Sequence, residues 1–472
     1  MAEQWVDVPL DAKLFLNVDE ASLTRAQAAL ENAYHNESGG LSRFPGLKSF
    51  ATLSDNGRAY LTDFRGDLMA GTSKGRVYRI NEAATVTDVT GVPITGGGRV
   101  IFDETEDYLM MAAGGQIIRF DGDTTTILSA NAPLTTHVGT IDSFVLAIEK
   151  NSGRFFHSDA GAPSTWNALS TFAADGRPDD IVAMLITQFR EVMLFGSDST
   201  EQFERLSSGT VPFFRRWAIG EGLSAPYCTL FTDNAVFCLN RAREFVRLSG
   251  QTSEPVGDDI GKAIEAIDDW TDAWVGGYPD NPLNIVGQRF ILLQAPKASN
   301  PYGTVGRTFV LDYRKRRWFE IYGWDAAVGR PPRWPGWSHW KHWDRTFVGG
   351  EGAVYEIDTA NHNNVGVTQR FLVRTAHLSE IGEVAIENLR LRVKRGVGTY
   401  AVSPTISVRC NRDNRGWSNW VRKGLGKTGA YPMNLEFGSF GHGHAFQFEV
   451  EVTDDCQVEL VKMQILPSSA DH

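Results

Sequence analysis

The sequence predicts an all-β protein, a β-propeller of six or seven blades followed by a C-terminal β-sandwich. Three observations lead to this fold class: a recurring hairpin unit, short strands between the hairpins, and cleaner two-residue alternation near the C-terminus. At 472 residues the chain exceeds one ordinary compact domain, which suits a repeat fold with an appended domain. Its 47 Gly and 19 Pro residues are enough for many turns.

The hairpin unit consists of a small polar turn, four to six apolar residues, a Gly- or Asn-containing turn and an alternating strand. Seven copies occupy residues 67–80, 108–120, 144–157, 192–205, 235–248, 290–321 and 346–357. Together with further short strands between them, they give the four-strand period of a propeller blade. A single four-stranded sheet cannot bury both faces, whereas blades packed radially can. Two sandwiches with coincidentally similar spacing are the alternative.

These patterns divide the chain into three parts: an N-terminal arm (1–44), a propeller (45–366) and a C-terminal sandwich or platform domain (367–472). The N-terminal stretch is expected to supply a strand to the last blade. In the final part, segments such as 389–394 and 445–452 alternate with period two, which indicates strands with one buried and one wet face. About 100 residues of such strands form a β-sandwich.

Three segments depart from the repeat. Residues 20–34 contain good helix formers with poor apolar spacing, which fits a short helix or an irregular arm. Residues 260–275 place Ile260, Ile264 and Ile267 at helical spacing and predict a short surface helix. The stretch 330–343 is rich in Pro and Trp and is expected to be a long ordered loop.

The net charge of −11 is unevenly distributed along the chain. Residues 367–466 hold 13 Lys/Arg and 10 Asp/Glu, a balance of +3, which leaves −13 on residues 1–366. An acidic body does not favour nucleic-acid binding, but an acidic wall suits a passage that must not hold DNA.

A basic strand is the clearest candidate docking surface. Arg390, Arg392 and Lys394 share one strand face, and Arg395 follows. They form either a solvated sheet face or a surface for an acidic partner, such as another copy of the acidic propeller; DNA contact is a third reading.

Thirteen Trp residues are many for this length. Tryptophan favours buried packing and protein interfaces. A place in the core and a place in a subunit interface are therefore equally weighted predictions for four of them: Trp334, Trp337, Trp340 and Trp343.

Motifs for chemistry are weak, so we expect no enzyme, no cofactor and no metal site. Gly71-Thr-Ser73-Lys-Gly75 has the letters of a nucleophile elbow, but a strand rather than a helix follows it. The segment 424–428 lacks the first glycine of a phosphate loop. The close His pairs, His339 with His342 and His442 with His444, lack neighbouring ligands in the sequence.

Targeting and redox signals are equally sparse. The four cysteines form no Cys-x-x-Cys pair, so buried free thiols in a reducing compartment are expected. Acidic residues interrupt the N-terminus, where a signal peptide would need an apolar run, and no apolar run reaches membrane length.

Three ordered stretches resemble the tail hub, or nozzle, proteins of short-tailed bacteriophages, also described as packaged-DNA stabilisation proteins. The first is Phe44-Pro45-Gly46, where the chain enters the propeller. The second runs from Asp180-Ile181 through Phe195-Gly196 to Thr200-Glu201-Gln202-Phe203, with Gln202 in place of the family's apolar residue. The third is the Gly-Leu-Ser-Ala segment 222–225. Order and spacing make the similarity specific over about 60 residues.

The resemblance implies a structural virion protein that forms a homohexameric ring in the phage tail and is assembled in the host cytoplasm. The ring would bind the head-to-tail adaptor above and tail fibres, spikes or a needle below. It would retain packaged DNA and form its exit channel without sequence-specific binding. Two other functions stay open: a carbohydrate-binding or carbohydrate-degrading tail propeller, and a host scaffold propeller.

Overall fold

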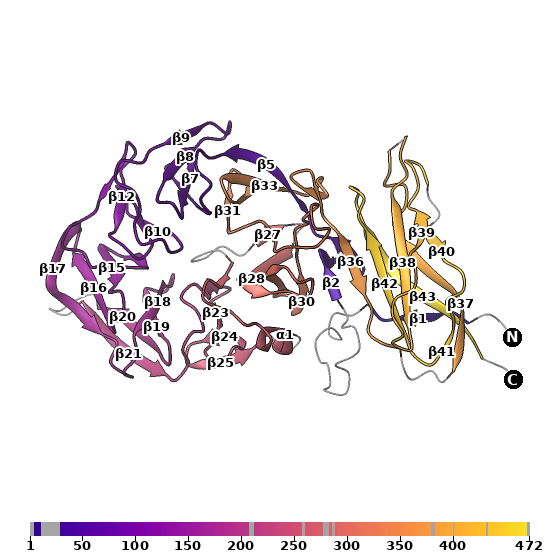
Figure 1. The fold of residues 1–472 in the computed structure, drawn as a ribbon. Coiled ribbons are helices and arrows are strands. Elements are labelled where there is room, and N and C mark those ends of the chain that lie inside the picture. The colour runs from indigo at the N-terminus through magenta and orange to yellow at the C-terminus, as the bar shows by residue number, and fades with distance from the viewer. Residues whose placement is uncertain are drawn as a thin grey trace.

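The computed structural model describes residues 4–10, 29–206, 212–256, 260–276, 283–285, 288–378, 383–399, 401–430 and 433–469. Over these residues the chain is almost entirely β, with one five-residue helix, α1 (Gly261–Glu265). The strands build a ring of blades and, beside it, a two-layered C-terminal module (Figure 1). The all-β prediction is confirmed.

Five blades are separate four-stranded antiparallel sheets. The first comprises β6 (Ala59–Phe64), β7 (Asp67–Thr72), β8 (Val77–Ile80) and β9 (Val86–Asp88). The second comprises β10 (Ile101–Glu104), β11 (Leu109–Ala112), β12 (Ile118–Phe120) and β13 (Thr125–Ile127). The third comprises β14 (Val138–Ile141), β15 (Phe144–Ile148), β16 (Arg154–Asp159) and β17 (Ala162–Ala173). The fourth comprises β18 (Ile181–Ile186), β19 (Glu191–Gly196), β20 (Thr200–Arg205) and β21 (Phe213–Ile219). The fifth comprises β22 (Thr229–Thr232), β23 (Ala235–Leu239), β24 (Phe245–Ser249) and β25 (Thr252–Pro255).

Two further sheets close the ring. One contains β31 (Ser338–His342), β32 (Arg345–Gly349), β33 (Ala353–Asp358) and β5 (Gly46–Thr52), extended by β34 (Asn363–Asn364) and β35 (Val367–Thr368). The other contains β26 (Trp274–Val275), β27 (Leu283–Ile285), β28 (Gln288–Ser299), β29 (Val305–Asp312) and β30 (Arg317–Glu320). Six sheets are thus separate blades, and a seventh group of strands completes the ring but continues into the C-terminal module. The prediction of six or seven blades is confirmed.

The predicted hairpins correspond to the two middle strands of the blades. Tight turns join the innermost strand of a blade to the first of these: Arg65 and Gly66 join β6 to β7, and Asp233 and Asn234 join β22 to β23, all with positive φ. Such two-residue turns match the twist of the strands that they connect. Strand β5 pairs antiparallel with β33, which confirms that the N-terminal stretch supplies a strand to the last blade.

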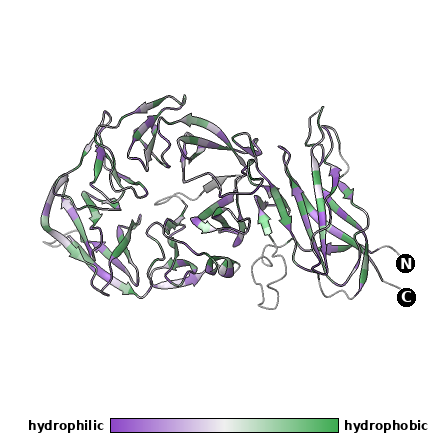
Figure 2. Cartoon of the chain, viewed as in Figure 1, coloured by the Kyte–Doolittle hydropathy of each residue, from purple (hydrophilic) through white to green (hydrophobic). Residues whose placement is uncertain are grey.

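The C-terminal module has two layers. Its first layer continues the ten-stranded sheet from β30 through β2 (Ala29–Glu31), β36 (Phe371–Arg374), β42 (Phe446–Val452), β38 (Thr405–Arg412) and β39 (Val421–Gly424). Its second layer contains β1 (Val6–Val8), β3 (Ala33–His35), β4 (Leu41–Arg43), β37 (Val384–Val393), β40 (Asn434–Glu436), β41 (Gly441–Gly443) and β43 (Glu459–Ser469). Buried apolar side chains from both layers, such as Leu391 and Val408, form one core cluster. Figure 2 shows apolar and polar stretches interleaved along these strands.

The described part of the predicted N-terminal arm is built into this module. Strand β1 pairs with β43, and β3 and β4 extend the same sheet. Residues 29–31 and 33–35 are strands, so neither the short helix nor the irregular arm considered for 20–34 is found there, and residues 20–28 lie outside the described residues. Pairing with distant strands outweighs the local helix propensity.

Two other local expectations also change. The loop expected over 330–343 contains β31, whose turn at Trp343 and Asp344 has positive φ at both residues. The predicted surface helix is reduced to the five residues of α1. Ile264 and Ile267 are not at a surface but are buried in a core shared with the fifth blade and the sheet of β28 to β30.

Candidate functional site

The basic strand face lies on β37, in the outer layer of the C-terminal module. Arg390, Arg392 and Lys394 alternate with Leu389, Leu391 and Val393, which are fully buried. This alternation directs the three cations away from the core, as the sequence predicts.

Partners within the chain reduce the free charge of this face. Arg390 forms an ion pair with Glu436 at 2.7 Å, and its guanidinium lies 3.7 Å from the ring centroid of Trp5. Lys394 donates a hydrogen bond to Gln457 at 2.9 Å. Arg392 is exposed and has no ion pair with the residues that the structure describes. Arg395 lies beyond the strand, 3.4 Å from the carbonyl of Gly424.

The tryptophan candidates separate into two pairs. Trp334 and Trp337 are 0% and 5% exposed, so they are core residues and offer no surface to another subunit. Trp340 and Trp343 are half-buried between the first and last blades, and the Trp340 indole donates to Asp63 at 2.7 Å. Of the four tryptophans, therefore, only Trp340 and Trp343 remain candidates for a subunit interface.

The Phe44-Pro45-Gly46 motif lies where the chain passes from the C-terminal module into the propeller. Phe44 is fully buried, with its ring centroid 5.9 Å from that of Phe290 and 5.8 Å from that of Phe319. A Cβ at Gly46 would lie 2.2 Å from the carbonyl oxygen of Asn363, so only glycine fits this crossing. The motif is explained by packing.

The second motif stabilises the fourth blade. Asp179 accepts hydrogen bonds from the backbone of Asp198 (2.8 Å) and Ser199 (3.1 Å), in the turn after Phe195-Gly196. A Cβ at Gly196 would lie 2.1 Å from the same Asp179 carboxylate. The motif therefore specifies a turn held by a carboxylate.

Two further motif residues hold neighbouring loops. Glu201 is buried, accepts a hydrogen bond from the backbone of Gly176 at 2.7 Å and lies 3.3 Å from Arg215. The Thr200 hydroxyl donates to the carbonyl of Glu221. Through these contacts, Glu201 and Thr200 hold neighbouring loops in place.

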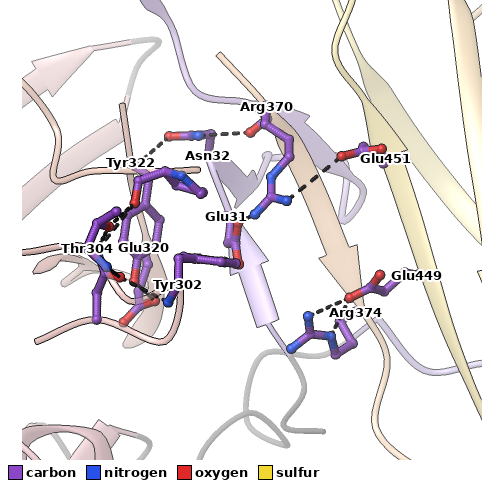
Figure 3. Close-up of polar contacts among 12 residues, drawn as sticks. Glu31, Asn32, Tyr302, Thr304, Glu320, Tyr322, Arg370, Arg374, Glu449 and Glu451 are labelled. Atoms are coloured by element: carbon purple, nitrogen blue, oxygen red, sulfur yellow. Dashed lines mark hydrogen bonds and ion pairs between the residues drawn. The ribbon is translucent and has the colours of Figure 1, made fainter. Parts of the chain in front are cut away.

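A charged network that the sequence did not reveal joins the propeller to the C-terminal module (Figure 3). Strand β2 runs parallel to β30 of the propeller and antiparallel to β36 of the module, so one sheet crosses the junction. Glu31 on β2 is buried and lies 2.5 Å from Arg370, which also approaches Glu451 at 3.9 Å. Glu31 is 339 positions from Arg370 in the sequence, so no local pattern could have found this network.

Three more ion pairs flank this junction. On the module side, Glu449 is completely buried between Arg374 and Arg409. On the propeller side, Glu320 pairs with Arg307 and accepts the hydroxyl hydrogen of Tyr322 at 2.7 Å. Figure 3 shows Glu320 and Tyr322 on the propeller side of β2, and Arg374 and Glu449 on its module side.

Glu31 gives the junction a pH dependence. Burial raises the pKa of Glu31 to about 7, against the opposing effect of Arg370. The folded chain thus holds a proton that the unfolded chain releases near pH 4.5, so this stabilisation is complete below that pH and is lost as the pH rises through 7. As the pH rises from acidic to alkaline, we expect the free energy of unfolding of Glu31→Gln to increase by about 3 kcal/mol relative to that of wild type.

Urea unfolding of both proteins at a series of pH values measures this gain. Glu37→Gln, an exposed glutamate on the loop between β3 and β4, is the matched control and should run parallel to wild type. If the free energies of unfolding of Glu31→Gln and wild type differed by the same amount from pH 4 to 8, the raised pKa of Glu31 would be contradicted.

The remaining motifs fall in ordinary structural positions. Ser73 lies in the turn between β7 and β8, where its hydroxyl accepts a hydrogen bond from the backbone of Arg58. All four cysteines are buried and free. Over the residues that the structure describes, no three His, Cys, Asp or Glu side chains gather as metal ligands. The only helix in the described ranges, α1, is far too short to span a bilayer.

The ring of blades and the sheet that continues into a two-layered module define the class: a β-propeller protein with a fused accessory module. Residues 24–246 match the family described as Bacteriophage P22 Gp10, beta-propeller. This match covers strands β2 to β5, four complete blades and the first two strands of the fifth. It confirms the resemblance to phage tail hub and DNA-stabilisation proteins and indicates a phage structural protein.

Solved structures share the propeller at low identity. A streptogramin B lyase is 8% identical, with a TM-score of 0.45, over 66% of this chain and 97% of its own. BamB from Moraxella catarrhalis is 13% identical, with a TM-score of 0.38, over 65% of this chain and 94% of its own. An inactive virginiamycin B lyase from Staphylococcus aureus is 9% identical, with a TM-score of 0.43, over 66% and 97%. No curated protein matches the sequence. These likenesses carry no information about function.

Proposed function

We propose that this chain is one subunit of a homohexameric tail hub, or nozzle, of a short-tailed phage. The ring binds the head-to-tail adaptor on one side and fibres, spikes or a needle on the other, retains packaged DNA and forms its exit channel. The match of residues 24–246 to the P22 Gp10 propeller family is the observation that carries the proposal. Its role is structural rather than catalytic, its place is the virion tail, and it is assembled in the host cytoplasm.

The charge distribution supports a ring built from unlike surfaces. Residues 1–366 carry −13 and residues 367–466 carry +3, so a basic C-terminal face can meet an acidic propeller of the next subunit. The division into arm (1–44), propeller (45–366) and platform (367–472) remains part of this proposal. In it, the described parts of the arm belong to the platform.

DNA passes between subunits in this proposal rather than through one propeller. One end of the propeller's own channel is occupied by side chains: His137 and Tyr227 stack with centroids 5.4 Å apart, and the Arg99 guanidinium lies 4.2 Å from the Trp274 ring centroid. A duplex about 20 Å wide needs a much larger opening, which a ring of subunits provides.

The carbohydrate-processing alternative needs convergent carboxylates at the propeller mouth. At this end of the channel, Asp272 lies 3.4 Å from Arg58, and Glu351 lies 3.9 Å from Arg333. Both carboxylates are paired with arginines rather than with each other, so this observation favours the structural role.

Charge reversal on β37 tests the ring. We expect Arg390→Glu, Arg392→Glu and Lys394→Glu together to abolish ring assembly on phage particles, because an acidic face would meet an acidic propeller. Negative-stain microscopy and native mass spectrometry of tails would show the loss. The control reverses Arg415, Arg422 and Lys427, three exposed cations of the same module outside this strand, and should assemble.

Circular dichroism distinguishes lost assembly from misfolding, since the reversed chain should remain folded. Normal infectious tails from the β37 variant would refute the role of this face. Absence of the wild-type protein from tails, or a monomeric state even with the adaptor ring present, would refute the tail-hub proposal itself.

A further inference from the structure

The innermost strands of neighbouring blades begin at the same end of the propeller channel. Arg58, Arg99 and Trp337 stand just before β6, β10 and β31, and the residue pair Tyr227 and Trp274 forms a parallel bridge at the starts of β22 and β26. Parallel inner strands bring these side chains, which are far apart in sequence, to one place. The result is a cluster of arginines and aromatic rings.

Trp337 lies at the centre of this cluster. The guanidinium of Arg58 lies 4.0 Å from its ring centroid, and that of Arg333 lies 3.6 Å from it. Each of these arginines has a carboxylate partner: Asp272 at 3.4 Å from Arg58, and Glu351 at 3.9 Å from Arg333. Asp272 also pairs with Lys297 at 3.0 Å, so these two carboxylates are shared among three cations.

Arg99 is the third arginine and has no such partner. Its guanidinium lies 4.9 Å from the centroid of Tyr60 and 4.2 Å from that of Trp274. Its side chain makes one hydrogen bond within the described structure, from Nη1 to the carbonyl of Trp337 at 2.7 Å. Across the described ranges no carboxylate lies within 4.0 Å of it.

This charge is present at neutral pH. Burial lowers the pKa of Arg99 only to about 10, so the guanidinium stays protonated. A charge enclosed by protein is costly unless an opposite charge or several hydrogen bonds compensate it. Cation–π contacts with Tyr60 and Trp274 supply part of the compensation but leave the net charge.

A small cavity opens beside Arg99. Its volume is about 20 Å³, and its lining includes Arg99, Tyr60, Ser338 and His339 but no Asp or Glu. A space of this size holds a single water-sized particle. Phosphate, sulfate or a sugar acid is too large for it.

We propose that this cavity is a binding site for one monatomic anion, chloride or a related halide, held by the Arg99 guanidinium. The anion supplies the negative charge that the protein does not, and it links the inner strands of the first, second and last blades. This site does not depend on the proposed tail function, since it is formed within a single propeller.

Crystals of the full chain soaked in sodium bromide test the proposal directly. Bromide replaces chloride and scatters anomalously, so an anomalous peak within hydrogen-bonding distance of Arg99 Nη or Nε is the expected result. An ordered water there without anomalous signal would overturn the proposal.

Thermal unfolding gives an independent readout. We expect the Tm of wild type to be about 2 °C higher, or more, in sodium chloride than in sodium gluconate at equal ionic strength. Arg99→Met should lose this difference. Arg65→Met should keep it, because Arg65 also lies over a ring, that of Phe64 at 4.9 Å, but on an exposed turn. Equal Tm values of wild type in the two salts would overturn the proposal even if Arg99→Met fails to fold.

Discussion

Glu449→Ala is expected to lower the free energy of unfolding by about 4 kcal/mol. The Glu449 carboxylate is completely buried and bridges Arg374, at 2.6 Å, and Arg409. Removing it leaves two guanidiniums close together beneath the Trp417 loop, with their mutual repulsion uncompensated. Guanidinium chloride unfolding followed by tryptophan fluorescence measures the loss.

The matched control is Glu387→Ala, an exposed glutamate on β37 without an ion pair in the described structure, which should change stability by less than about 0.5 kcal/mol. A second variant separates charge from packing. Replacing Arg374, Glu449 and Arg409 together by Met, Leu and Met should restore most of the stability, since buried ion pairs are often matched by apolar groups. A loss for Glu449→Ala no larger than that of the control would contradict the network.

Arg43→Met is expected to cost about 4 kcal/mol, because it leaves several buried carbonyl groups without a donor. Arg43 is buried, and its guanidinium donates to the carbonyls of Val452 (2.6 Å), Asp454 (2.6 Å) and Cys456 (2.9 Å). These bonds attach the end of β4 to the turn between β42 and β43. The substitution should therefore also detach the N-terminal strands from the C-terminal module.

Hydrogen exchange measures that detachment: amides of β3 and β4 should lose protection, while those of the first blade keep it. Arg415→Met, at an exposed arginine in the hairpin after β38, is the control and should leave both stability and exchange unchanged. Unchanged protection of β4 in Arg43→Met would show that strand pairing alone holds the N-terminal segment.

The blade hairpins could be predicted because their signal is local. An apolar strand, a turn that tolerates positive φ and an alternating strand follow one another within about 15 residues, as at Gly75 between β7 and β8. The motif residues Gly46 and Gly196 were also visible, although only the structure shows why glycine is required: another residue's oxygen occupies the space of a Cβ.

The candidate surfaces could be predicted less well. Alternation placed Arg390, Arg392 and Lys394 on one exposed face of β37, but it could not show that Glu436 and Trp5 contact Arg390. Composition marked Trp334 and Trp337 as packing or interface residues alike. Only the surrounding blades decide that both are buried.

The all-β class, the repeated blades and the resemblance to a phage family could be predicted from the sequence alone, because alternation, turn chemistry and ordered motifs are properties of neighbouring residues. The tertiary structure alone decided how the parts join. Strand β2 lies between β30 and β36, almost 300 residues away on one side and 340 on the other, and no local pattern specifies such pairing. The balance of buried charge was decided there too: within the described residues, Glu31 has its arginine and Arg99 has no carboxylate partner because of where distant strands end.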